Sequence, residues 1–368
     1  MKNNCYVDFH VIQTVPPSCV NRDDTGSPKT SMYGGKMRAR VSSQSWKHAM
    51  RIMFEDLFSP EYLGKRTKRI HQLIISKILE AKPELADNPK KLNTEIVNLF
   101  KNAGITLKMK KKSDEIEGTD ALFFMSNRQA ELIAKIYLEK TENKSDDDYK
   151  TELKQALKVY PSVDMALFGR MVASDPSLNY DATAQVAHAI STHEVQTEYD
   201  YFTAVDDLAP EDNAGAGHLG TIEYNSSTMY RYASVNIKEL TVYLQEDTAE
   251  AVKNFAKAFI LSMPTGKQNT FANRTVPDFV YVTIREDQPV NFCAAFEKPV
   301  FARSEGYVIP SIQRLDEYAK KVYKNFVDAP NKSFAIGEDG ILSEAQHVSI
   351  KELFDALEIS VEEFQTQG

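Results

Sequence analysis

Two kinds of hydrophobic periodicity divide this chain, and their order along the sequence restricts the fold more than any other feature. Apolar residues alternate with other residues at 6–14, 229–237 and 279–284, which predicts strands. Residues 60–160 instead carry apolar side chains at helical spacing, interrupted by polar breaks, and a further helix is predicted at 248–261. Strands that flank a long helical insertion are typical of an α+β sheet domain, not of a doubly wound parallel sheet.

The segment after the first predicted strand combines a helix start with a row of cations. Ser42 and Ser43 suit a helix N-cap, and apolar residues then recur at helical spacing, as at Trp46 and Met50. Between residues 35 and 51 every charged side chain is a cation: Lys36, Arg38, Arg40, Lys47 and Arg51. Hydroxyl groups at a helix N-terminus with nearby cations suit phosphate binding. Taken alone, the segment fits a solvated basic helix equally well.

The formal net charge of -8 argues against a nucleic-acid partner at first sight, but the charges are unevenly distributed. From Glu338 to the last residue there are eight carboxylates and one cation, Lys351, a formal charge of -7. This acidic segment accounts for most of the deficit. Because charge interactions are screened over about 8–10 Å in physiological salt, a basic surface elsewhere can still bind a polyanion.

Several kinds of chemistry lack a sequence signal. Cys5, Cys19 and Cys293 fit neither a disulfide framework nor a zinc site, which favours a reducing, cytoplasmic location. No apolar run of about 18 residues is present and the first residues lack a secretion signal, so no membrane partner is expected. The seven histidines are scattered and no nucleophile or metal motif is found. We therefore expect no cofactor.

Three loops are further candidates for binding. Asp23 and Asp24 beside Arg22 could hold a divalent metal that activates water, although a simple turn is the commoner role of such a loop. The glycine-containing turn 266–268, with a lysine at its centre, can cradle a phosphate. The basic loop 108–112 is explained better as solvated surface than as a nucleic-acid contact.

Short stretches with a specific order and spacing are spread over most of the chain. They lie at 17–24, 34–36, 40–45, 163–171, 187–193, 200–208, 218–220, 230–233, 266–268 and 295–298. With these stretches in this order, the sequence resembles the CasC family, the guide-RNA-binding backbone subunits of type I-E CRISPR Cascade complexes. The helical region 60–160 matches this family least.

The resemblance implies a hand-like α+β fold. The palm would be RRM-like (ferredoxin-like) and would comprise 1–60, 181–197 and 226–368, including the acidic C-terminal segment. Helical fingers would occupy 61–180, and a short thumb 198–225. The resemblance also implies that copies of the chain stack in a helical filament along one CRISPR guide RNA, which pairs with target DNA, beside the subunits CasA, CasB, CasD and CasE. Such a protein holds the guide without reading its sequence and is not an enzyme.

The resemblance assigns roles to individual residues. Arg22, Lys47 and Arg51 match positions that bind guide phosphates. The whole set of expected RNA-binding residues is Arg22, Lys36, Arg40, Ser42, Gln44, Lys47, Arg51, Arg170, His218, Lys267 and Gln268. The apolar group expected near a displaced nucleotide is Met171, Tyr201, Phe202 and Val205. The family often has tryptophan at the position of Tyr201, and a tyrosine ring can also stack on a base.

Alternatives remain open at this point. A type III-like backbone subunit would cut target RNA with a metal-bound loop aspartate, for which Asp23 or Asp24 could serve. A stand-alone RNA-binding module would bind RNA without assembling. In the thumb, Tyr201 and Phe202 could pin the loop to its own palm instead of reaching a neighbouring copy. Directly after Lys298 this chain reads Pro-Val-Phe-Ala-Arg303, where the family carries more lysines, so no DNA contact is assigned there.

Overall fold

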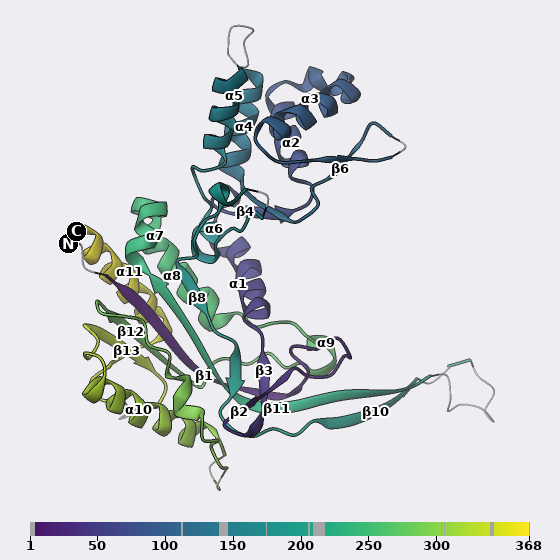
Figure 1. The fold of residues 1–368 in the computed structure, drawn as a ribbon. Coiled ribbons are helices and arrows are strands. Elements are labelled where there is room, and N and C mark those ends of the chain that lie inside the picture. The colour runs from purple at the N-terminus through teal and green to yellow at the C-terminus, as the bar shows by residue number, and fades with distance from the viewer. Residues whose placement is uncertain are drawn as a thin grey trace. The chain divides into compact units, whose positions relative to one another are not determined.

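The computed structural model describes residues 4–111, 113–139, 146–173, 175–204, 207–208, 218–302, 304, 306–338 and 342–367. The chain forms two compact units, whose elements are labelled in Figure 1. Unit 1 comprises Met1–Met53, Gln185–Lys238 and Ala249–Gly368, and unit 2 comprises Phe54–Ala184 and Glu239–Thr248. Both units contain helices and strands, so the chain has the mixed α+β composition that the sequence predicts.

Unit 1 is built on a sheet whose four central strands are antiparallel and follow the order β12-β1-β11-β9. Their bounds are Tyr6–Ser18 for β1, Ala189–Ser191 for β9, His218–Asn236 for β11 and Phe279–Arg285 for β12. The strands predicted at 6–14, 229–237 and 279–284 are therefore confirmed. Shorter strands extend the sheet: β13 (Lys332–Ile336) and β14 (Gln346–His347) beyond β12, β3 (Lys36–Val41) and β2 (Thr30–Tyr33) beyond β9, and β8 (Ala184–Val186), which pairs with β11.

One face of this sheet is covered by α8 (Thr248–Leu261) and by the start of α1 (Ser43–Leu57). Phe9 of β1 lies 5.6 Å from Phe255 and 5.9 Å from Phe259, measured between ring centroids. The guanidinium of Arg231 lies 3.7 Å over the ring of Trp46. The apolar stripe predicted in this first helix therefore faces the sheet.

The opposite face is covered by the short helix η6 (Phe292–Phe296) and by α10 (Val308–Asn325). His10 stacks on Phe292 at 4.4 Å, and Tyr230 and Tyr281 are buried in the same cluster. The centre of the sheet is therefore covered on both faces. Unit 1 also contains α9 (Gln268–Phe271) and α11 (Ile350–Gln367).

Strand β11 is much longer than the sheet that it crosses. Its last twelve residues pair with β1, whereas residues 218–224 pair with β10 (Glu198–Ala204). Figure 1 shows this hairpin running out from the sheet as a two-stranded ribbon. Every residue of β10 is exposed.

Unit 2 is mainly helical and has its own core. Its helices are α2 (Ile70–Ala81), α3 (Pro89–Asn102), α4 (Asn127–Leu138), α5 (Asp146–Ala156) and α6 (Val163–Phe168). All five lie in or next to the region 60–160, for which the sequence predicts helices. Two small sheets were not predicted: β4 (Gly64–Thr67) with β7 (Phe123–Ser126), and β5 (Lys108–Met109) with β6 (Ile116–Gly118). The segment Glu239–Thr248, which includes the end of α7 (Ile237–Leu244) and the 3-10 helix η5 (Gln245–Asp247), belongs to this unit.

Candidate nucleic-acid interface

The loop after β1 is tied to the first turn of α1. The backbone N–H of Ser42 donates to Oδ1 of Asn21 at 2.9 Å, and the Ser42 hydroxyl accepts a hydrogen bond from the N–H of Ser45 at 3.3 Å. Ser42 is buried and acts as the N-cap, which gives it a structural role, and its contact with RNA stays a prediction. Arg22 and Gln44 are exposed on either side of this junction.

The aspartate loop beside Arg22 is a hydrogen-bonded turn. One carboxylate oxygen of Asp23 accepts hydrogen bonds from the N–H and hydroxyl of Thr25, at 3.0 and 2.8 Å, and from the N–H of Ser27 at 3.0 Å. These bonds, that of the Thr25 hydroxyl first, lower the pKa of Asp23. Within the described parts of the chain, no group of three or more His, Cys, Asp or Glu side chains is placed to hold a metal ion. The turn is the role that the geometry supports for Asp23.

The turn at Gly266 brings a distant lysine to the same loop. A Cβ atom on Gly266 would lie 2.0 Å from the carbonyl oxygen of Val20, so only glycine allows this approach. Lys267 follows with a left-handed backbone (φ 52°). Burial raises the pKa of the Cys19 thiol, and the charges of Arg22 and Lys267 both oppose that rise. The two cations, which are far apart in sequence, therefore lie near one another, and we call Arg22, Gln44, Lys267 and Gln268 the basic rim.

Two more predicted cations follow along α1. Lys47 and Arg51 are half-buried, on the flank of the helix that carries Trp46 and Met50 into the core. Partial burial lowers the pKa of Lys47 because the charged ammonium loses hydration. Their spacing of four residues places both side chains on one side of the helix.

The β2–β3 hairpin uses its cations in three different ways. Lys36 forms an ion pair with Glu194 at 3.0 Å, and Arg40 lies 3.1 Å from Nδ1 of His188. Arg38 is fully buried and donates to the carbonyl oxygens of three residues: Ser191, Phe296 and Glu297. The sequence analysis did not single out Lys29, whose charge acts on His188 together with Arg40.

Arg170 is buried in this structure, and its contact with RNA stays a prediction. The side chain is 4% exposed and donates to the carbonyl oxygens of Leu178, Leu157 and Phe124 at 2.7 to 3.2 Å. The N–H groups of Arg170, which could bind a phosphate, are instead hydrogen-bonded to backbone carbonyl oxygens of unit 2. Met171, the next residue, is 84% exposed, as an apolar contact residue requires.

The β10–β11 hairpin carries the other predicted apolar residues. Tyr201 is 67% exposed. Tyr199, two residues earlier on the same strand, is exposed to a similar extent and was not expected from the sequence. The ring of Phe202 lies over Gly220 on the opposite strand, where a Cβ would approach it to 2.3 Å. Val205 and the side chain of His218 lie outside the described residues.

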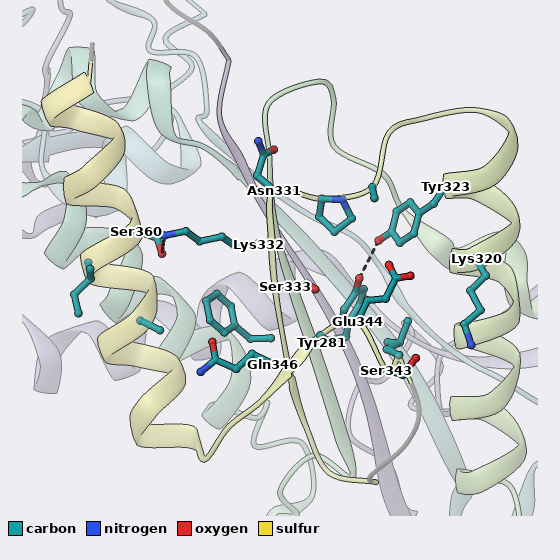
Figure 2. Close-up of a pocket in the computed structure, with 17 residues that line it drawn as sticks. Tyr281, Lys320, Tyr323, Asn331, Lys332, Ser333, Ser343, Glu344, Gln346 and Ser360 are labelled. Atoms are coloured by element: carbon teal, nitrogen blue, oxygen red, sulfur yellow. Dashed lines mark hydrogen bonds between the residues drawn. The ribbon is translucent and has the colours of Figure 1, made fainter.

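A separate pocket of unit 1 contains none of these residues. It has a volume of about 520 Å3 and lies between α10, β13 and α11 (Figure 2). The hydroxyl groups of Tyr281 and Tyr323 meet there at 3.1 Å, and the ammonium of Lys332 donates to the Ser360 hydroxyl at 3.2 Å. Its polar groups are engaged with one another, so it offers no cluster of cations for phosphate.

The chain is similar in structure to chains of CRISPR RNA-guided surveillance complexes. Over 97% of its length, the chain matches all of a chain described as "CRISPR RNA-guided surveillance complex, pre-nicking", with a TM-score of 0.82 and 31% identity. A second chain, described as "CRISPR RNA-guided surveillance complex", matches with a TM-score of 0.62 and 28% identity, covering 96% of this chain and 99% of the other. No curated protein sequence matches.

The family follows from the sequence match. The family described as CT1975-like protein matches residues 7–360. The chain therefore belongs to this family, which comprises the CasC backbone subunits of type I-E Cascade, and the resemblance inferred from the sequence is confirmed.

Proposed function

We propose that this chain binds CRISPR guide RNA through the basic rim and the adjoining cations of α1, as a repeated backbone subunit of a surveillance complex. The observation that carries the proposal is the convergence of Arg22 and Lys267 beside the N-terminus of α1, with Lys47 and Arg51 further along that helix. Cations and helix N–H groups bind phosphates, and none of these groups is suited to one preferred base sequence. Binding that ignores sequence is what a guide carrier needs.

The strand order of unit 1 supports its assignment as an RRM-like palm. The order β12-β1-β11-β9, with α1 and α8 connecting strands on one face, is that of a ferredoxin-like fold. RRM domains usually stack bases on aromatic residues of the open sheet face. Here Tyr230 and Tyr281 are buried on that face beneath η6 and α10. The RNA would therefore follow the loops at the edge of the sheet.

We assign unit 2 to the fingers and the β10–β11 hairpin to the thumb. The exposed rings of Tyr199 and Tyr201 suit stacking on bases, which tolerates any base. In this proposal the thumb reaches a neighbouring copy in a helical filament, and the guide pairs with target DNA. CasA, CasB, CasD and CasE would be the companion subunits, in the cytoplasm. No helix among the described residues has the length and apolar character of a membrane span.

The competing function is metal-dependent cleavage of target RNA, as in type III backbone subunits. The CasC family is generally non-catalytic, and Asp23 is engaged by Thr25 and Ser27. We expect no cleavage of guide-bound target RNA with magnesium or manganese. Cleavage that disappears in Asp23→Ala or Asp24→Ala would favour the competing function.

The proposal is tested by the salt dependence of guide binding. Lys47→Glu with Arg51→Glu removes two phosphate contacts, so the slope of log K against log salt should fall by about 1.4, at roughly 0.7 per contact on single strands. Filter binding over a range of salt concentrations measures this slope. Lys320→Glu, at an exposed position of α10, is a single charge reversal outside the site and should leave the slope unchanged. An unchanged slope in the double variant would remove these residues from the site.

A further inference from the structure

Unit 2 contains a pocket of about 370 Å3 that includes none of the expected RNA-binding residues. Its walls come from three parts of this unit: the end of η1 (Pro60–Tyr62), the start of α4 with residues 158–163, and residues 242–247. Four tyrosines line it: Tyr62, Tyr160, Tyr180 and Tyr243. Such a concentration of rings in one small pocket indicates a binding site for a group that stacks on aromatic faces.

One wall of the pocket is fixed in a strained conformation. The Gln129 side chain donates to the carbonyl oxygens of Leu157 and Val159 at 3.0 and 2.9 Å, and the Ser126 hydroxyl donates to that of Tyr160 at 2.7 Å. Tyr160 has a left-handed backbone (φ 52°), and its side chain is 57% exposed. The surrounding bonds therefore hold a strained residue whose large ring faces solvent, a combination found at ligand sites.

The chain already places guanidinium groups on two of the four rings. Arg128 lies 5.1 Å over the ring of Tyr62, and Arg170 lies 4.8 Å over that of Tyr180. Tyr243 packs edge-on against Tyr180 at 5.5 Å. Among the described residues, the ring of Tyr160 meets neither a cation nor another ring. It is the ring of this pocket that remains available to a ligand.

The charges of the pocket favour a cationic ligand. Glu61, Glu246 and Asp247 line it, and no ion pair joins any of them to a cation in the described parts of the chain. Two cations also line it: Arg128, which is engaged with Tyr62, and Lys158, whose charge acts on Asp175. The carboxylates therefore outnumber the cations by three to two. Ser162 adds a hydroxyl that is 3% exposed and has no hydrogen-bond partner within the described structure.

We propose that this pocket binds an arginine side chain of a partner protein. A guanidinium can stack on Tyr160 while its N–H groups donate to the carboxylates and to the Ser162 hydroxyl, which needs a planar cation with several donors. A nucleotide fits less well because the three carboxylates outnumber the two lining cations and on balance repel its phosphate. The proposal is independent of guide binding, since it concerns different residues of another unit.

The test uses the RNA-free full-length chain and three probes: the peptide acetyl-Gly-Arg-Gly-amide, the same peptide with uncharged citrulline, and AMP. Saturation-transfer NMR measures their affinities. We expect the citrulline peptide to bind at least about fivefold more weakly than the arginine peptide, since a cation on an aromatic face contributes roughly 0.5–2 kcal/mol. Equal affinities, or tighter binding of AMP, would overturn the proposal.

Two variants locate the site. Glu246→Gln with Asp247→Asn should lower the affinity for the arginine peptide about fivefold, whereas Glu250→Gln, an exposed carboxylate outside the pocket, should not change it. An equal loss in both would place the peptide elsewhere. In the assembled complex the partner should already fill the pocket, so peptide binding should be lost; full retention there would exclude a partner at this site.

Discussion

Residues 225–236 and residues 218–224 belong to the same strand, β11, and meet opposite environments. The first stretch pairs with β1 and is covered on both faces, by α8 and α1 on one and by η6 and α10 on the other. The second pairs with β10, whose residues are all exposed. One half of β11 therefore lies in the core of unit 1, and the other half pairs with β10, whose aromatic rings the fold does not bury.

The difference shows that an apolar residue in a strand pattern has two possible uses. Tyr230 and Tyr201 are both strand tyrosines, but only Tyr230 is inaccessible. Burial makes a ring part of fold stability, whereas exposure leaves it free to stack on a ligand. Substitutions in the two halves should therefore separate stability from binding.

The largest expected effect is in β1, which pairs with the buried half of β11. Phe9→Ala removes a ring that packs between Phe255 and Phe259, so the free energy of unfolding should fall by about 3–5 kcal/mol. Urea unfolding of the RNA-free chain measures the change. A loss below about 1 kcal/mol would contradict the view that this face of the sheet is the core of unit 1.

This contrast also marks how far the sequence could predict the structure. Alternation located β1, β12 and the buried half of β11. Both faces of these strands are buried, but in β1 one face carries apolar residues such as Phe9 and the other carries polar ones such as Asp8 and His10, which leaves a period of two. Alternation did not locate β4 or β5, because strands of four and two residues are too short to show a period. Nor could residue type separate Arg22 from Arg170: both are arginines in family-matching stretches, and only the fold shows that one is exposed and the other bonded to carbonyl oxygens.

The stability that β1 contributes should also respond to pH, because Asp8 and His10 are buried in this strand. Burial lowers the pKa of His10 to about 3 and raises that of Asp8 to about 6. The stabilising contribution from His10 is present above its unfolded pKa near 6.5 and is lost as the pH falls. That of Asp8 is present at low pH and is lost as the pH rises through about 6. The two effects oppose each other between roughly pH 6 and pH 4.

Single substitutions should reveal these opposing effects. In Asp8→Asn only the pH effect of His10 remains, so the free energy of unfolding should fall by about 1.4 kcal/mol for each pH unit below about 6. In His10→Phe only the pH effect of Asp8 remains, and the free energy of unfolding should rise as the pH falls over the same interval. Urea unfolding at pH 6.5, 5.5 and 4.5 measures both. Parallel pH profiles for the two variants would show that neither group is buried as described.

Substitutions in β10, which pairs with the exposed half of β11, should affect binding and not stability. Tyr201→Ala should change the unfolding free energy by less than about 0.5 kcal/mol, because the ring lies on the surface. Target-DNA binding by the reconstituted complex should weaken by about 1–3 kcal/mol, the value of one base stack. Phe202→Ala is the informative neighbour, since its ring also covers Gly220. A lower melting temperature of Tyr201→Ala with unchanged affinity would show that the hairpin rings serve their own unit.

The smallest expected effect concerns Lys36, a cation whose side chain is neither buried nor fully exposed. Lys36 is at the surface but already pairs with Glu194 at 3.0 Å, with both side chains nearly half exposed. Such a pair contributes about 0–1 kcal/mol, so Glu194→Gln should leave stability almost unchanged. The ammonium released from Glu194 can then bind a guide phosphate. Guide affinity should rise, by at most about fivefold, and the salt slope should steepen by up to about 0.7.

A double-mutant cycle decides whether that gain comes from Lys36. Lys36→Met alone should change guide affinity little, because the lysine is held by Glu194 in the unbound chain. In Lys36→Met with Glu194→Gln the gain of the single Glu194 variant should disappear, since no ammonium remains to be released. If the gain persists in the double variant, it arises from removing a negative charge near the RNA, and Lys36 then has no part in guide binding.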